Sequence, residues 1–271
     1  MTAPEPLHRL RAGWSETAPA AAGVTCLLLH HSGGSAASFV EFARHLPAHW
    51  EVQAVELPGR GRSFGERPCR SMDETVDLLA RALEENRRDY VLFGHSLGGL
   101  IAYELTREME RLGKPPRWLG VSGCGSPDVL CDEPRERRDL WDSERLTDFL
   151  RSLGGTPEEV LRVPEMVDYL VGVLRWDLGI MDSYRHRPGA SMTTAVSVFG
   201  GMSDPVVPER AIRGWREFTG PDTRLHMWPG GHFYLFERMA EVAAVIGRDT
   251  ADAMRLTYSG EKRRTDKHGC D

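Results

Sequence analysis

Short apolar runs alternate with helical patterns of hydrophobic positions along most of this chain. The continuous runs predict buried strands at 24–29, 52–57, 90–93, 118–122, 195–199 and 224–228. Hydrophobic spacings of three and four residues predict helices over 35–46, 71–83, 97–112, 208–218 and from about residue 237. Strands that alternate with helices indicate an α/β protein with a mostly parallel sheet covered on both faces.

The alternation is interrupted once, over about residues 125–188. No strand pattern occurs there, and helix-start signals such as Ser143 and the sequence Thr156-Pro157-Glu158-Glu159 follow one another. We therefore expect a helical insertion within a single domain that spans residues 1–257. The remaining segment, 258–271, is polar and is predicted to be disordered.

Composition and charge limit the classes of protein to which the chain could belong. The chain has 271 residues, of which 41% are hydrophobic, enough for a sizeable core. Its net charge of −6 argues against a dedicated partner for nucleic acid or anionic membranes. No apolar run approaches the roughly 18 residues of a membrane span, and no signal peptide is evident. The five scattered cysteines predict reduced thiols in a cytoplasmic protein: Cys26, Cys69, Cys124, Cys131 and Cys270.

One serine lies where a strand pattern passes into a helix pattern. Ser96 stands between Gly94 and Gly98 in the stretch LFGHSLGG. In a Gly-x-Ser-x-Gly turn of this kind the serine hydroxyl is exposed above the carboxyl edge of the sheet, and larger residues at the glycines would collide with neighbouring backbone. Although the motif also occurs by chance around a simple N-cap, its context predicts a nucleophile.

A serine nucleophile requires a base and an acid. In α/β proteins with such a serine turn, the acid and the base follow the serine along the chain in the order Asp or Glu, then His, each after a later strand. Asp204 follows the predicted strand 195–199, and His232 follows 224–228. Each residue alone has an ordinary explanation, as a turn residue or a helix cap, but together they predict a catalytic triad. Asp128, after the strand 118–122, is the alternative acid.

The turn after the first predicted strand, His30-His31-Ser32-Gly33-Gly34, is where this fold supplies an oxyanion donor. The backbone N–H groups of Ser32 and Leu97 are the predicted donors. A metal site is the competing interpretation of the paired histidines, but adjacent side chains diverge and no further ligand spacing accompanies them. We predict no metal or cofactor, and we interpret His95 as a packing residue.

The chain resembles the discrete type II thioesterases that accompany modular polyketide and nonribosomal peptide synthases. The matching segments are HHSGGSAASF, ELPGRGRSFGE, GHSLGG, VSGCGSPD, LRWDLGIMDSYRHRPG, VFGGMSDPVVP and WPGGHFYL. The resemblance implies an α/β-hydrolase fold with a helical lid and a triad at Ser96, Asp204 and His232. The chain differs from the usual family pattern at His30, Ser32, Cys124 and Trp176.

The resemblance also implies a substrate and a partner. The substrate is an acyl group in thioester linkage to the phosphopantetheine arm of an acyl- or peptidyl-carrier protein, hydrolysed through an acyl-enzyme. In the lid, an apolar stripe forms either an ordinary core face or the lining of an acyl chamber: Met166, Leu170, Leu174, Trp176 and Met181. The loop arginines Arg60, Arg62, Arg67 and Arg70 are either solvated surface groups or a docking site for the acidic carrier.

Three other functions remain open on sequence grounds. The same triad serves hydrolases of oxygen esters or lactones, since the fold does not select sulfur over oxygen. It also serves a chain-releasing cyclase, in which an internal hydroxyl replaces water. A non-catalytic binding module is the third, and the complete set of serine, aspartate and histidine argues against it.

Overall fold

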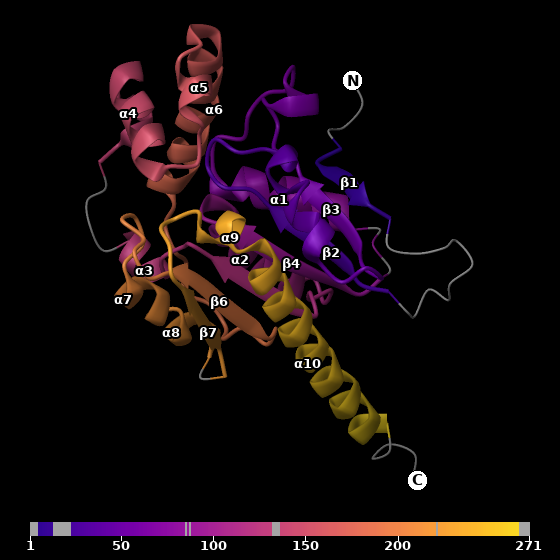
Figure 1. Ribbon diagram of the computed structural model, residues 1–271. Helices are drawn as coiled ribbons and strands as arrows, with labels where there is room; N and C mark the ends of the chain where they lie inside the picture. Colours follow the sequence, from indigo (N-terminus) through magenta and orange to yellow (C-terminus); the bar gives the residue numbers. More distant parts are fainter. Residues whose placement is uncertain are drawn as a thin grey trace.

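A central sheet organises the computed structural model, which describes residues 5–12, 23–84, 86, 88–131, 136–220 and 222–265 (Figure 1). The seven strands lie in the order β1-β3-β2-β4-β5-β6-β7. They are β1 Leu7–Arg11, β2 Thr25–Leu29, β3 Glu51–Val55, β4 Tyr90–His95, β5 Trp118–Ser122, β6 Val196–Gly201 and β7 Arg224–Trp228. All neighbouring pairs are parallel except β1 and β3, which are antiparallel.

Strand β1 was not predicted from the sequence. It reads Leu-His-Arg-Leu-Arg and is only partly buried, because it lies at the edge of the sheet. A half-exposed edge strand has no continuous apolar run, so the pattern that identified the central strands does not mark it. The other six predicted strands are confirmed within a few residues.

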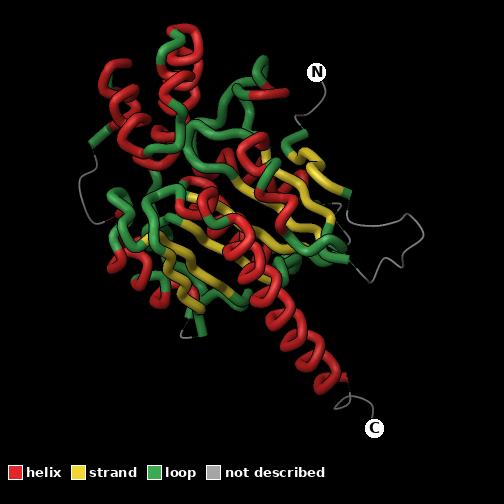
Figure 2. Tube along the Cα trace, viewed as in Figure 1, coloured by secondary structure: helices red, strands yellow, loops and turns green. Residues whose placement is uncertain are grey.

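Helices cover both faces of the sheet, as predicted (Figure 2). On one face, Leu27 and Leu29 of β2 pack with α1, Met72–Leu83, and α2, Leu97–Arg111. On the other face, Cys26 and Leu28 pack with α9, Tyr234–Glu237, and α10, Met239–Thr265. Alternate residues of a strand point to opposite faces, so one strand contributes to both cores. Ser71 caps α1 by accepting the N–H of Glu74, at 3.2 Å.

Two predicted helices take a different form. Residues 35–46 form two 3₁₀ helices, η2 Ala36–Phe39 and η3 Phe42–His45. The fully buried Phe39 and Phe42 are three residues apart, a spacing that three-residue turns place on one side. The predicted helix 208–218 is divided into α7, Glu209–Arg213, and α8, Arg216–Thr219. At the break, the Trp215 indole donates to the Cys124 carbonyl at 2.7 Å.

Helix α10 continues to Thr265, past residue 257, where the predicted domain ends. The apolar pattern of α10 ends near Met254, but the following residues include glutamate, lysine and arginine, which have high helix propensity. Polarity alone therefore did not indicate the end of the helix. Residues 266–271 lie outside the described part of the chain.

The insertion is helical, as predicted. It contains α3 Pro127–Cys131, η5 Arg138–Leu140, α4 Ser143–Leu153, α5 Glu158–Leu161 and α6 Pro164–Ser183. Helices α4 and α6 share a small core that includes Leu146, Leu174 and Leu178. Figure 1 shows α4, α5 and the first part of α6 standing apart from the sheet. This insertion, residues 125–188, is called the lid below.

The structure also describes three of the five cysteines and the hydropathy of the helices. Cys26, Cys69 and Cys124 are buried and none of the three is in a disulfide, and burial raises the pKa of Cys26 to about 12. The side chains of Cys131 and Cys270 lie outside the described residues. None of the helices that the structure describes combines the length and the hydropathy that a membrane span requires.

Candidate active site

The turn between β4 and α2 holds Ser96 in an unusual backbone conformation. Its φ is 56° and its ψ −120°, and it is the one non-glycine residue with positive φ in the described part of the chain. The Ser96 N–H donates to the Ser122 carbonyl at 2.7 Å. A Cβ on Gly94 would overlap the Gly98 carbonyl, and one on Gly98 would overlap the Leu29 carbonyl. Backbone strain of this kind is typical of functional sites and of the nucleophile turn of α/β hydrolases.

A buried acid and histidine lie at the ends of the two neighbouring strands β6 and β7. The Nδ1 of His232 is 2.8 Å from Oδ2 of Asp204, and the two side chains are only 2% and 1% exposed. Because a carboxylate accepts hydrogen bonds, Nδ1 carries the proton and Nε2 is left as the basic nitrogen. Asp204, and not the alternative Asp128, is the acid that contacts His232.

Backbone hydrogen bonds hold this pair in place. The other carboxylate oxygen of Asp204, Oδ1, accepts the N–H groups of Val206 at 2.8 Å and Val207 at 3.0 Å. The two loops also bond to each other, since the Ser203 N–H donates to the Gly230 carbonyl at 3.0 Å. The acid and the imidazole are therefore oriented before any substrate binds.

His95, the residue before Ser96, packs against His232. The rings of His95 and His232 are 5.0 Å apart between centroids. His95 is completely buried, and its Nδ1 is 2.9 Å from Oγ of Ser122, which lies 2.7 Å from the Tyr234 hydroxyl. Burial, with the nearby His232 and His31, lowers the pKa of His95 well below its ordinary value. His95 is thus a neutral, packed ring beside the predicted triad.

The loop 30–34, called the oxyanion loop below, is held by its own histidines. The carbonyl of His31 accepts from Nδ1 of His30 at 2.8 Å and from the Gly34 N–H at 3.0 Å. The N–H of Ser32 belongs to the same trans peptide and points the opposite way. Nδ1 of His31 in turn donates to the Ser32 carbonyl at 2.9 Å. Burial lowers the pKa of His30 to about 3 and that of His31 to about 4, so both rings are neutral.

The second predicted donor belongs to the helix that follows the serine. Leu97 is the first residue of α2, so its N–H has no acceptor in a preceding helical turn, and the helix dipole favours negative charge there. Leu29 of β2 is paired with Gly94 of β4. Because these parallel strands end side by side, the oxyanion loop and the Ser96 turn lie at the same edge of the sheet. Ser32 and Leu97 remain the predicted oxyanion donors.

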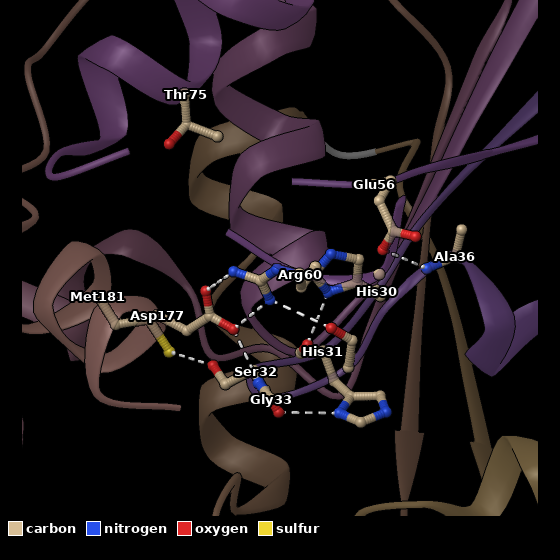
Figure 3. Close-up of polar contacts among 12 residues, drawn as sticks. His30, His31, Ser32, Gly33, Ala36, Glu56, Arg60, Thr75, Asp177 and Met181 are labelled. Atoms are coloured by element: carbon tan, nitrogen blue, oxygen red, sulfur yellow. Dashed lines mark hydrogen bonds and ion pairs between the residues drawn. The ribbon is translucent and has the colours of Figure 1, made fainter. Parts of the chain in front are cut away.

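The five predicted lid residues do not share one surface. Leu174 is fully buried, and Leu170 packs against the same lid core. Met166 and Trp176 are each 43% exposed. Two of the five lie against the oxyanion loop: the Sδ of Met181 accepts from the Ser32 hydroxyl at 3.6 Å (Figure 3), and a Cβ on Gly33 would come within 3.9 Å of Leu174. A lining role toward the acyl group stays a prediction for these side chains.

Arg60 corrects the interpretation of the four loop arginines as surface groups. Its side chain is buried and forms a bidentate ion pair with Asp177 of α6, with N–O distances of 2.6 and 2.7 Å (Figure 3). The other three, Arg62, Arg67 and Arg70, are exposed. Sequence reasoning missed Asp177. The signal was an acid on the apolar helix face that carries Leu174 and Met181, because a buried carboxylate requires a partner.

Comparison with known proteins shows the family to which the chain belongs. A family model, the thioesterase domain, matches residues 25–250. The chain is 34% identical to thioesterase PikA5 of Streptomyces venezuelae over 246 residues, which cover 89% of this chain and 84% of the relative. It is 32% identical over 224 residues to gramicidin S biosynthesis protein GrsT of Aneurinibacillus migulanus, covering 82% and 87%. The type II thioesterase BorB from the borrelidin biosynthetic cluster matches with a TM-score of 0.81 and 30% identity, covering 92% of this chain and 99% of that one.

The parallel sheet, with its helices on both faces and its helical lid, is an α/β-hydrolase fold, as the sequence predicted. The chain belongs to the thioesterase family. It is therefore a hydrolase that acts on thioesters, and the resemblance to type II thioesterases is confirmed.

Proposed function

We propose that this chain hydrolyses acyl groups from the phosphopantetheine arm of carrier proteins in polyketide or nonribosomal peptide synthesis, using Ser96, His232 and Asp204. The observation that carries the proposal is the buried 2.8 Å contact between His232 and Asp204, at the same edge of the sheet as a serine held at positive φ. Relatives support the substrate class, because ClbQ comes from a colibactin NRPS/PKS pathway and GrsT is a gramicidin S biosynthesis protein.

In the first half of the reaction, Nε2 of His232 removes the Ser96 hydroxyl proton while Oγ attacks the thioester carbonyl carbon. The Ser32 and Leu97 N–H groups stabilise the oxyanion. The carbon–sulfur bond then breaks, and the thiol of the arm leaves with the proton from His232. In the second half, His232 removes a proton from water as the water oxygen attacks the acyl carbon. The bond between that carbon and Ser96 Oγ then breaks, Oγ takes the proton back from His232, and the free acid leaves. Asp204 keeps the proton of the imidazole on Nδ1 throughout.

The proposed function is tested with a panel of acyl groups on one carrier protein. Acetyl, propionyl, malonyl and longer acyl thioesters are incubated with the chain, and the freed product is identified by mass spectrometry. We expect free acids, and we expect a fluorophosphonate probe to label the peptide that contains Ser96.

Each alternative function predicts a different result once matched oxygen esters and hydroxyacyl thioesters are added to the panel. Faster turnover of matched oxygen esters would indicate an ester or lactone hydrolase. A ring product from a hydroxyacyl substrate would indicate a cyclase. The absence of both product and label would indicate a non-catalytic binding module and would contradict the proposal.

We also predict that an acidic carrier protein docks at the exposed arginines of the loop after β3. Arg62 and Arg67 lie in the loop after β3, and charge complementarity with an acidic carrier would act mainly on association. We expect the double substitution Arg62→Glu and Arg67→Glu to lower kcat/KM for carrier-bound acyl groups about 10-fold. Turnover of the corresponding N-acetylcysteamine thioesters should stay within about 2-fold, because these lack the carrier.

The matched control for docking is Arg111→Glu. Arg111 is equally exposed, at 68%, but lies at the end of α2 and pairs with Glu108. An equal loss with all substrates, or the same loss in the control, would argue against docking at the loop. Arg60 is excluded from this test because it is buried.

A further inference from the structure

A buried ion pair joins the lid to the loop after β3. Nη2 of Arg60 is 2.6 Å from Oδ1 of Asp177, and Nη1 is 2.7 Å from Oδ2. The two side chains are 3% and 0% exposed. Asp177 lies in the middle of α6, far along the chain from Arg60. Two charges removed from water in this way are costly unless they are well paired, so a buried bidentate pair calls for a specific explanation.

The same two side chains bind the backbone of the oxyanion loop (Figure 3). Oδ2 of Asp177 accepts the Gly33 N–H at 2.8 Å. Nη1 of Arg60 donates to the Gly34 carbonyl at 3.1 Å. The two side chains therefore bind each other and also bind the Gly33 N–H and the Gly34 carbonyl of the loop.

The Gly33 contact fixes the peptide next to the predicted oxyanion donor. The Ser32–Gly33 peptide has its carbonyl bound by His31 and its N–H bound by Asp177. The Ser32 hydroxyl contacts Met181, which lies one helical turn beyond Asp177 on α6. Helix α6 thus contacts the loop on both sides of the Ser32–Gly33 peptide.

Charge gives the pair a second effect. An unpaired carboxylate beside the oxyanion loop would repel the negative charge that develops during attack on the thioester. Arg60 offsets that charge through two short hydrogen bonds. The buried Glu56 lies just beyond the loop, where its Oε1 accepts the Ala36 N–H at 3.1 Å.

We propose that Arg60 and Asp177 are positioning residues, which hold the oxyanion loop in its reactive conformation and join it to lid helix α6. The Ser32 N–H is then correctly placed only while α6 packs against the loop. This inference rests on the proposed function, because it assumes that the Ser32 N–H binds the oxyanion.

The test compares Asp177→Asn with Asp182→Asn. Asp182 is the matched control because it is a fully buried acid on the same helix, paired with Arg138, and its recorded contacts are to residues outside the oxyanion loop. Both substitutions remove one buried charge from α6. A purely structural role would therefore give similar results for the two variants.

For Asp177→Asn we expect kcat to fall on the order of 10- to 100-fold with KM within about 3-fold, since the oxyanion donor is displaced and not removed. Affinity for a trifluoromethyl ketone analogue, which forms an oxyanion on Ser96, should fall by the same factor. Asp182→Asn should lower the melting temperature comparably but change kcat less than about 3-fold. Equal loss of kcat and analogue affinity in the two variants would overturn the proposal.

A second comparison applies even if Asp177→Asn folds poorly. Arg60→Gln leaves an unpaired carboxylate beside the loop, whereas the double variant Arg60→Gln with Asp177→Asn restores a neutral, hydrogen-bonding pair. We expect the double variant to have about 10-fold higher kcat than Arg60→Gln alone. A double variant no better than the single one would contradict the charge argument.

The parent chain and Ser96→Ala are measured in the same experiment. If the parent does not release acids, or if Ser96→Ala keeps its activity, the proposed function fails. If both behave as expected but Asp177→Asn matches Asp182→Asn, only the role of the ion pair fails.

Discussion

Replacement of Ser96 by alanine is expected to reduce thioester hydrolysis by on the order of 10⁴-fold or more, because it removes the proposed acceptor of the acyl group. The substitution removes one hydroxyl from a turn whose backbone is held by the Ser122 carbonyl and by the close glycine contacts. The His232–Asp204 contact does not involve Ser96, so it should persist. The loss should therefore be in kcat, with little change in substrate affinity.

Rapid mixing with an acyl-carrier substrate provides the measurement. The parent chain should release free carrier thiol in a burst followed by a slower phase if hydrolysis of the acyl-enzyme limits turnover, and Ser96→Ala should show neither phase. Ser203→Ala is the matched control, since Ser203 is exposed in the loop that carries Asp204. Ser96→Ala activity within about 10-fold of the parent would remove the nucleophile assignment.

Mild acid is expected to destabilise the fold through its buried histidines. Burial lowers the pKa of His30 to about 3 and that of His31 to about 4, and it lowers the pKa of His95 well below its ordinary value. In the unfolded chain all three rings bind a proton below about pH 6.5. Their contribution to stability is therefore complete above that pH and is lost as the pH falls toward the folded-state pKa. Each ring should lower the free energy of unfolding by about 1.4 kcal/mol per pH unit.

Urea unfolding at pH 7 and pH 5 measures this effect. We expect a loss of about 2 kcal/mol from each of His30 and His31 between these values, and a further loss from His95. His30→Gln keeps a donor for the His31 carbonyl but removes a titrating ring, so it should reduce the dependence on pH by about one ring. His49→Gln, at an exposed histidine, should leave it unchanged. A pH dependence equal in His30→Gln and the parent would show that His30 does not contribute.

The structure gives the unusual residue His30 a local role. Type II thioesterases usually have proline at this place, and proline offers no side-chain donor. Here Nδ1 of His30 bonds the His31 carbonyl, which orients the peptide whose N–H is the predicted oxyanion donor. The paired histidines, which suggested a metal site as one alternative, each bind a backbone carbonyl through Nδ1.

Local pattern was sufficient for much of the fold and of the candidate site. The apolar runs of β2, β4 and β5 are continuous because these strands are buried on both faces, so they are readable without a partner. Ser96, Asp204 and His232 each follow a strand, and parallel strands end at one edge of a sheet. Their order along the chain therefore predicted the contact between His232 and Asp204.

The sequence by itself determined the α/β class and the helical lid, and it predicted the reactive groups, because these depend on periodicity and on short motifs at strand ends. Only the tertiary structure decided that Arg60 is buried and that Asp177 is its partner, because 117 positions separate them along the chain. It also decided that both residues bind the oxyanion loop. Such long-range pairing depends on how the lid packs against the sheet, which no local pattern of polar and apolar residues contains.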